Sequence, residues 1–249
     1  MTAPIAIVTG AARRVGRVLA QGLLDDGWQV VAHVHANKDE VPPGAIRVVA
    51  DLSHGDCAER LLAACAEAPR LLVNNAARFA ADSLTDFSPV EFAAHMAVNV
   101  VAPVMLTAAF AKLSVDHDGD RSIVNILDAK LSAPNTDFLS YTLSKSALAQ
   151  LTELSARALA SKGIRVNAIA PALMLQSAGQ TPDNFAQMHR HNPLRRGIEP
   201  HDVLRALRYL RDSAGTTGEI MLLDGGQRFW GLERDVQFLP VQPNEKPET

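Results

Sequence analysis

Tyr141 and Lys145 are the two residues of this chain whose types and spacing most directly suggest chemistry. If the segment around them is helical, their spacing places both side chains on one face, one turn apart. A phenol has an ordinary pKa of about 10, and a neighbouring cation stabilises the phenolate and lowers that value. The spacing therefore places a cation where it can stabilise a phenolate, although such pairs are common on helices. A tyrosine that packs on a helix beside a solvated lysine is the alternative.

A run of small residues between Thr9 and Gly16 indicates a second kind of chemistry, the binding of phosphate. The run follows an apolar stretch and opens a helical pattern, and in that context a backbone turn can approach a pyrophosphate. Free N–H groups and the helix dipole favour an anion there. An ordinary strand-to-helix turn is the alternative. The residues expected to hold a dinucleotide are Gly10, Arg13, Arg14, Val15 and Gly16.

The next apolar stretch ends without the acidic residue that NAD-binding sites use to hold the ribose 2′-hydroxyl. It reads VAHVHAN, and the first carboxylate after it belongs to Asp39. With two arginines in the preceding turn, this pattern favours a 2′-phosphate, and therefore NADPH over NADH. We expect His33 and His35 to line the cofactor site. No metal is expected, because no third ligand lies at a useful spacing from them.

The elements that must position these residues are of two kinds, since short β-branched stretches alternate with longer helical patterns. Such alternation predicts an α/β fold with a single Rossmann-type, doubly wound parallel sheet of about seven strands flanked by helices. Between the second and third strands, Pro42, Pro43 and Gly44 favour a loop over a helix. The expected strands are Ile5–Thr9, Gln29–Val34, Ile46–Ala50, Leu71–Asn74, Ile123–Leu127, Arg165–Ile169 and Ile220–Leu223, and the expected helices are Val15–Asp26, Ala58–Glu67, Pro89–Leu113, Tyr141–Ser161 and Asp202–Arg211.

Composition excludes several classes of function. The 249 residues carry a net charge of −3, whereas a nucleic-acid binder normally has a basic excess. No uninterrupted apolar run reaches about eighteen residues, so no membrane span is expected. Cys57 and Cys65 match neither a disulfide framework nor a zinc site. The N-terminus enters a strand without room for a signal peptide, and a cytoplasmic location is expected.

Taken in order, these motifs resemble those of the short-chain dehydrogenase/reductase family over about residues 4–226. The resemblance implies that Tyr141 donates a proton, and that Lys145 lowers its pKa and holds the nicotinamide ribose. It also implies that Asn99 holds a water behind Lys145, and that Asp51 meets the adenine edge. Leu52, Asn75, Ala76 and Pro171 are further implied cofactor residues. The residues that carry the resemblance are Thr9–Gly16, Asp51-Leu52, Asn74-Asn75-Ala76-Ala77, Asn99, Tyr141–Lys145 and Pro171.

The chain departs from the commonest family pattern at one position, which in that pattern holds a serine whose hydroxyl polarises a carbonyl oxygen. Asp128 stands at that position, thirteen residues before Tyr141. An ionised carboxylate repels a forming alkoxide, so it would disfavour the reduction of a simple ketone. The carboxyl instead suits a substrate with N–H donors or a ring nitrogen that needs a proton. A cap on the turn into Lys130–Asn135, or lost catalysis, is the alternative.

Two further residues favour a flat heterocycle as substrate. Arg14 replaces the central glycine of the turn, and its guanidinium can project over the phosphates toward a planar ligand. Phe79 follows Asn75 by four residues, where an aromatic ring can stack on a heterocycle above the nicotinamide. With Asp128, these residues resemble the pteridine reductase branch, which reduces dihydropteridines, including dihydrofolate, with NADPH. The resemblance implies that Arg14 and Phe79 hold the pterin while Asp128 and Tyr141 deliver protons; an exposed turn cation and a core phenylalanine are the alternatives.

One domain over residues 1–239 is expected, with a substrate lid at 172–196 and a mobile tail at 240–249. The resemblance implies a homotetramer or homodimer in which the helices around Phe92–Leu113 and Tyr141–Ser161 meet. The segment Gln227–Phe238 is too apolar for a free tail, and we expect it to pack across a subunit boundary.

The resulting hypothesis is an NADPH-dependent reductase that transfers hydride to a C=N bond of a small-molecule substrate, a reduced pterin or folate. The first alternative is a carbonyl or alcohol short-chain dehydrogenase with another substrate. The second is a non-catalytic NADP(H)-binding sensor in which Asp128 marks lost chemistry.

Overall fold

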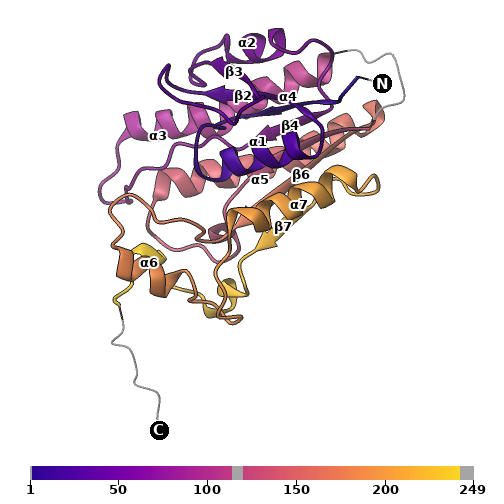
Figure 1. Ribbon diagram of the computed structural model, residues 1–249. Helices are drawn as coiled ribbons and strands as arrows, with labels where there is room; N and C mark the ends of the chain where they lie inside the picture. The colour runs from indigo at the N-terminus through magenta and orange to yellow at the C-terminus, as the bar shows by residue number, and fades with distance from the viewer. Residues whose placement is uncertain (1, 114–119, 242–249) are drawn as a thin grey trace.

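A single parallel sheet forms the centre of the protein. The computed structural model describes residues 2–113 and 120–241, and its sheet has the strand order β3-β2-β1-β4-β5-β6-β7. The chain begins in mid-sheet at β1, runs outward to β3 and returns to β4 on the other side of β1 (Figure 1). This is the doubly wound arrangement predicted from the sequence. The strands are β1 (Ile5–Val8), β2 (Gln29–Val34), β3 (Ile46–Val49), β4 (Leu71–Asn74), β5 (Arg121–Ile126), β6 (Ile164–Pro171) and β7 (Ile220–Leu223).

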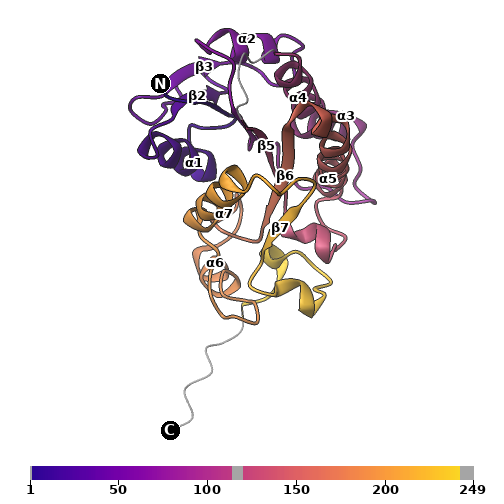
Figure 2. The same cartoon turned by 90° about the vertical axis from the view of Figure 1, so that its right-hand side faces the viewer.

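Helices cover both faces of the sheet (Figure 2). On one face lie α1 (Arg14–Asp25) and α7 (Pro200–Asp212), and on the other lie α2 (Cys57–Ala63), α4 (Ala102–Lys112) and α5 (Leu139–Leu159). Successive side chains of β1 enter opposite cores: Ala6 and Val8 pack with α1 and α7, while Ile5 and Ile7 pack with α2 and α4. Strands buried on both faces are continuously apolar, and that is why their positions could be predicted.

The helix expected over Pro89–Leu113 is interrupted by a π-helical turn. α3 (Pro89–Met96) passes through the π turn Ala97–Val101 into α4. Such turns insert an extra residue into a helix and are frequent at functional sites. The run Pro89–Lys112 is also long and apolar enough to cross a membrane, with a mean hydropathy of 1.6. Polar residues such as Glu91 and Asn99 interrupt it, so the run is not continuously apolar. Here it packs along the sheet against α2 and α5.

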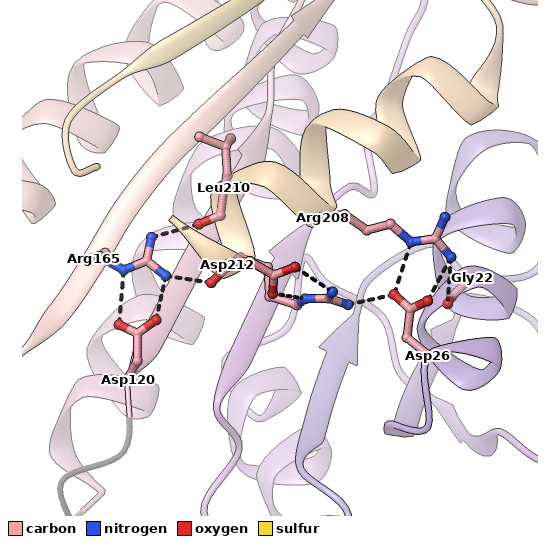
Figure 3. Close-up of polar contacts among 8 residues, drawn as sticks. Gly22, Asp26, Asp120, Arg165, Arg208, Leu210 and Asp212 are labelled. Carbon is pink, nitrogen blue, oxygen red and sulfur yellow. Dashed lines mark hydrogen bonds and ion pairs between the residues drawn. The ribbon is translucent and has the colours of Figure 1, made fainter. Parts of the chain in front are cut away.

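Three arginines tie the end of α7 to the amino end of the sheet (Figure 3). Arg165, at the start of β6, donates to the carbonyl oxygens of Leu210 at 2.6 Å and Arg211 at 2.7 Å, and binds both oxygens of Asp120. Arg208 and Arg211 both pair with Asp26, at the end of α1. These bonds satisfy carbonyl groups that a helix end otherwise leaves without partners. The network lies at the edge of the sheet opposite the carboxyl ends of the strands.

The predicted elements are confirmed, with a few corrections. Strand ends shift by one or two residues, the loop between β2 and β3 is confirmed, and both cysteines are free thiols. α2 ends at Ala63 rather than Glu67, because the chain must turn into the proline that precedes β4. The segment 172–196, for which closure over a substrate stays a prediction, contains a helix that was not predicted, α6 (Pro182–Met188). The predicted tail lies outside the described residues from residue 242 onward.

Candidate active site

The predicted site residues meet in one cleft at the carboxyl ends of the strands, with a volume of about 1060 Å³. Every residue predicted to bind cofactor or substrate lines this cleft, with the exception of Asn99. The cleft opens beside β1 and β4, where the strand order reverses. In doubly wound sheets this is the place where ligands bind.

The turn after β1 is a tight backbone cradle. Gly10 has a φ of +67°, and a Cβ on Gly16 would lie 2.1 Å from the Gly10 carbonyl oxygen. Asn75 Nδ2 donates to the Thr9 carbonyl at 2.8 Å, and Thr9 Oγ1 accepts from the backbone N–H groups of Asn75 at 2.9 Å and Ala76 at 3.0 Å. These bonds join the ends of β1 and β4. A cradle that a Cβ would fill fits the close approach of a pyrophosphate.

His33 holds this cradle with both of its ring nitrogens. Nδ1 accepts from the backbone N–H of Gly10 at 3.0 Å, so Nε2 carries the proton and donates to the Ala50 carbonyl at 3.0 Å. Burial lowers the pKa of the imidazole, which keeps this neutral tautomer. His33 therefore positions the turn rather than offering a nitrogen to a ligand, whereas His35 is exposed at the rim of the cleft.

Arg14 lines the cleft, and its backbone is unusual for an arginine. Its φ of +53° is in the left-handed region that favours glycine. Its guanidinium donates to the carbonyls of Gln176 at 2.9 Å and Leu175 at 3.2 Å, in the lid segment. The side chain thus joins the turn after β1 to the segment 172–196, and its predicted contact with a planar ligand stays a prediction.

Two carboxylates line the part of the cleft next to β2 and β3. Asp39 Oδ2 accepts from the backbone N–H of Ala36 at 3.0 Å, within the loop after β2. Asp51 Oδ1 accepts from the N–H of Ser53 at 2.9 Å and its hydroxyl at 2.7 Å, and these bonds lower the pKa of Asp51. Both carboxylates are thereby fixed by local turns.

The two oxygens of the Asp128 carboxyl have different partners. Its Oδ1 accepts from the backbone N–H of Lys130 at 2.9 Å and caps a short 3-10 turn, Ala129–Ser132. Its Oδ2 accepts from the Tyr141 hydroxyl at 2.9 Å. The structure therefore confirms the cap and places the second carboxyl oxygen against the tyrosine in the cleft, while the role of the carboxyl toward a substrate stays a prediction.

The electrostatics of Tyr141 differ from the expectation. Burial raises the pKa of Tyr141 well above its ordinary value, and the charge of Asp128 raises it further. The expected lowering by Lys145 is not found, because the Lys145 ammonium lies 5.7 Å from the tyrosine ring centroid and donates to the Ile126 carbonyl at 2.6 Å. Burial lowers the pKa of Lys145 to about 8, against the opposing effect of Asp128.

Asn99 lies behind the cleft and fixes the loop that follows β4. Its Oδ1 accepts from the Arg78 N–H at 2.7 Å, and its Nδ2 donates to the Arg78 carbonyl at 3.0 Å and to Ser144 Oγ at 2.9 Å. One helical turn earlier, the fully buried His95 accepts from the Ala80 N–H through Nε2 at 3.2 Å. The two side chains hold the backbone on both sides of residue 79.

Phe79, held in this way, belongs to an aromatic cluster beside the tyrosine. Its ring stacks on Phe138 with centroids 4.5 Å apart and meets Tyr141 edge-on at 4.7 Å. Phe238 stacks on Phe138 in turn, at 5.5 Å. Phe79 is 45% exposed and lines the cleft, so it is not a core phenylalanine.

Sequence reasoning missed three polar residues at the site. Asp82 accepts from the backbone N–H and the hydroxyl of Ser140, and so caps the helix that carries Tyr141. Lys130 and Asp235 both line the cleft and lie 3.7 Å apart as an ion pair. The segment around Asp235 is apolar, which predicts packing but not a site for a charged residue. Tertiary contacts bring Asp235 to the cleft of its own chain. The predicted contact of this segment with another subunit stays a prediction.

The geometry combines an anion cradle, a phenol–carboxyl pair and an aromatic surface in one cleft. The comparisons with known proteins agree with this combination. A family model described as enoyl-(acyl carrier protein) reductase matches residues 10–228. Pteridine reductase 1 of Leishmania tarentolae is 32% identical over 222 residues, which cover 69% of this chain and 77% of that protein. The human L-xylulose reductase is 31% identical over 235 residues, covering 90% and 95%.

A solved structure extends the similarity to the whole domain. The crystal structure of FolM alternative dihydrofolate reductase 1 from Brucella suis in complex with NADP has a TM-score of 0.83 and 34% identity, and the match covers 92% of this chain and 97% of that chain. The corresponding protein from Brucella canis, also complexed with NADP, has a TM-score of 0.80 and 32% identity. The similar proteins thus include reductases named for pterins and for sugars.

Proposed function

Because this chain belongs to the short-chain dehydrogenase/reductase family, we propose that it is an NADPH-dependent reductase of a C=N bond in a reduced pterin or folate. The observation that carries the proposal is the 2.9 Å hydrogen bond from Tyr141 to Asp128. A carboxyl at this position opposes the negative oxygen that forms when a ketone is reduced. The same carboxyl can accept N–H groups, or donate a proton to a ring nitrogen.

The cofactor proposal rests on the cradle after β1 and on the charges around it. Gly10 and Gly16 leave room for a pyrophosphate, and Arg13 and His35 line the cleft near the loop after β2. These two groups suit a 2′-phosphate. The two FolM structures contain NADP, which supports the same preference here. When bound, NADPH supplies a hydride to the substrate carbon.

The chain's own residues supply the proton and the orientation. The raised pKa of Tyr141 keeps its hydroxyl protonated at neutral pH, so the phenol can donate to the ring nitrogen of the reduced bond. Asp128 accepts this proton in a hydrogen bond until the hydroxyl turns toward the ring nitrogen, and the freed carboxyl oxygen can then accept an N–H of the ring. Phe79 presents an exposed aromatic surface beside both, where stacking on a flat ring contributes ~0.5–1.5 kcal/mol beyond area burial.

We also propose that the protein assembles from identical subunits, as a homodimer or homotetramer. Exposed apolar side chains on the helices named for this role in the sequence support the proposal: Val104 on α4 and Leu143 and Leu154 on α5 are each more than 40% exposed. Light scattering of the purified protein measures the assembly. Monomers at micromolar concentration would contradict it.

The test of function mixes purified protein with NADPH and either dihydrobiopterin or dihydrofolate, and follows the absorbance of the reduced nicotinamide. Oxidation with a pterin and not with a panel of ketones and sugars supports the proposal. Oxidation with carbonyl compounds alone would favour the carbonyl reductase, in agreement with the relatives that are sugar reductases. Cofactor binding without turnover on any substrate would favour the sensor.

A further inference from the structure

The C-terminal segment places a second carboxylate in the substrate region of the cleft. Asp235 begins the 3-10 turn Val236–Phe238, and its Oδ1 accepts from the Gln237 N–H at 3.1 Å. Its own N–H donates to Asp137 Oδ2 at 2.8 Å, beside the ion pair of Arg234 with Asp137 at 2.9 Å. The backbone on both sides of the carboxylate is therefore fixed against the loop that leads into α5.

The segment around Asp235 also contacts the aromatic cluster and the lid. Phe238 stacks on Phe138, which stacks on Phe79. Gln237 Nε2 donates to the Ala178 carbonyl at 3.1 Å, and Asn184 of α6 donates to the Leu239 carbonyl at 2.8 Å. The segment around Asp235 is thus held between residues 172–196 and the loop before α5, and Asp235 lines the same cleft as Phe79.

Lys130 connects this carboxylate to the one at Asp128. The Lys130 backbone N–H donates to Asp128, while its ammonium donates to the Asp137 carbonyl and lies 3.7 Å from Asp235 Oδ2. The Lys130 and Asp235 side chains are only 8% and 20% exposed. Two ammonium groups lie near these carboxylates: that of Lys145 donates to the Ile126 carbonyl, and that of Lys130 is shared between Asp235 and the Asp137 carbonyl.

We propose that Asp235 determines substrate specificity through charge. With Asp128 it places carboxyl acceptors in the substrate region, while the ammonium groups of Lys130 and Lys145 already have partners; this arrangement admits neutral, N–H-rich rings and disfavours ligands that carry carboxylates. It also occupies Lys130, which would otherwise attract such a carboxylate. This inference rests on the proposed function and narrows it to pterins whose side chain is uncharged.

The test measures binding, so that it does not depend on turnover. The dissociation constants of biopterin, which is neutral, and of folic acid, which carries two carboxylates, are measured by fluorescence on the protein–NADP+ complex. The variants are Asp235→Asn and, as a control, Glu233→Gln, which removes the same charge from an exposed position of the same segment. We expect Asp235→Asn to lower the dissociation constant of folic acid by about fivefold or more, and to change that of biopterin by less than about twofold. The control should change neither.

Ionic strength gives a second reading on the unaltered protein, in case Asp235→Asn disturbs the segment. Added salt screens the repulsion, so folic acid binding should improve relative to biopterin in the wild type and not in the variant. The inference would be overturned if Asp235→Asn changed the dissociation constants of both ligands equally, or if Glu233→Gln lowered that of folic acid as much as Asp235→Asn does. Failure of both ligands to bind would also overturn it, whereas binding without turnover would contradict the proposed reductase alone.

Discussion

The Tyr141 hydroxyl donates a hydrogen bond of 2.9 Å to Asp128, a carboxylate that also caps its own turn. This relationship connects the unusual residue of the site with the proton donor. Because Asp128 and burial both raise the pKa of Tyr141, the tyrosine holds its proton instead of approaching ionisation. The proton that the proposed reaction needs is therefore present on Tyr141 at neutral pH.

The buried Lys145 leads to a prediction about pH. Burial lowers its pKa to about 8, so the ammonium is present below that pH and is lost as the pH rises through it. If the ammonium holds the nicotinamide ribose, kcat/KM for NADPH falls above pH about 8, because this constant reports groups of the free enzyme. Initial rates at limiting NADPH from pH 6 to 10 measure the profile. A flat profile through the whole range would remove Lys145 from cofactor binding.

The cradle after β1 leads to a prediction about glycine. A Cβ on Gly16 would lie 2.1 Å from the Gly10 carbonyl oxygen and 2.5 Å from the Asn75 amide nitrogen, both of which are fixed by other bonds. Gly16→Ala should therefore weaken NADPH binding by at least about tenfold and lower the Tm. Gly55→Ala is the control, since a Cβ there meets no atom within 4 Å. Equal NADPH affinity in the two variants, measured by calorimetry, would be incompatible with a tight phosphate cradle.

Phe79 is predicted to bind the substrate and not the cofactor. Phe79→Leu removes the aromatic surface and should raise KM for the pterin by about two- to tenfold, with little change in NADPH affinity. Phe87→Leu is a matched control, because Phe87 has the same 45% exposure and does not line the cleft. Steady-state kinetics with varied pterin separates the two. A parallel rise of KM in both variants would show that Phe79 has no special role.

Arg165 is predicted to affect stability without affecting chemistry. Its side chain is 8% exposed and bonds Asp120 and the carbonyls of Leu210 and Arg211 at the end opposite the cleft (Figure 3). It also donates to the Thr216 carbonyl. Arg165→Met leaves these groups without a donor and should cost about 3 kcal/mol of unfolding free energy. Urea denaturation measures the loss. Arg157→Met, which breaks an exposed ion pair on α5, should cost at most about 0.5 kcal/mol.

Sequence patterns located most of this site for a topological reason. The turn at Gly10, the run at Asn75, and Asp128 follow parallel strands, and Pro171 is the last residue of another. The carboxyl ends of parallel strands lie at one edge of a sheet. A correct prediction of the strands was therefore enough to predict that these residues lie close together. Tyr141 and Lys145 joined them because the helix after β5 begins at the same edge.

Tertiary partners could not be predicted in the same way. His33 and His95 each use both ring nitrogens for backbone groups, and nothing in their local sequence distinguishes such histidines from ligands. Arg14 bonds carbonyls about 160 residues away, in a lid whose helix has no clear apolar period. Asp235 reaches the cleft through the fold of a segment beyond the last strand.

The most direct test of the central claim compares the wild type with Asp128→Ser on two substrates, dihydrobiopterin and 4-nitrobenzaldehyde, at saturating NADPH. If the carboxyl serves the nitrogens of a flat ring, kcat/KM for dihydrobiopterin falls by about a hundredfold, the usual contribution of a positioned proton-transfer group. The rate with the aldehyde should stay level or rise, because a hydroxyl stabilises a forming alkoxide better than a carboxylate does. An unchanged rate with dihydrobiopterin, or an equal loss on both substrates, would contradict the account.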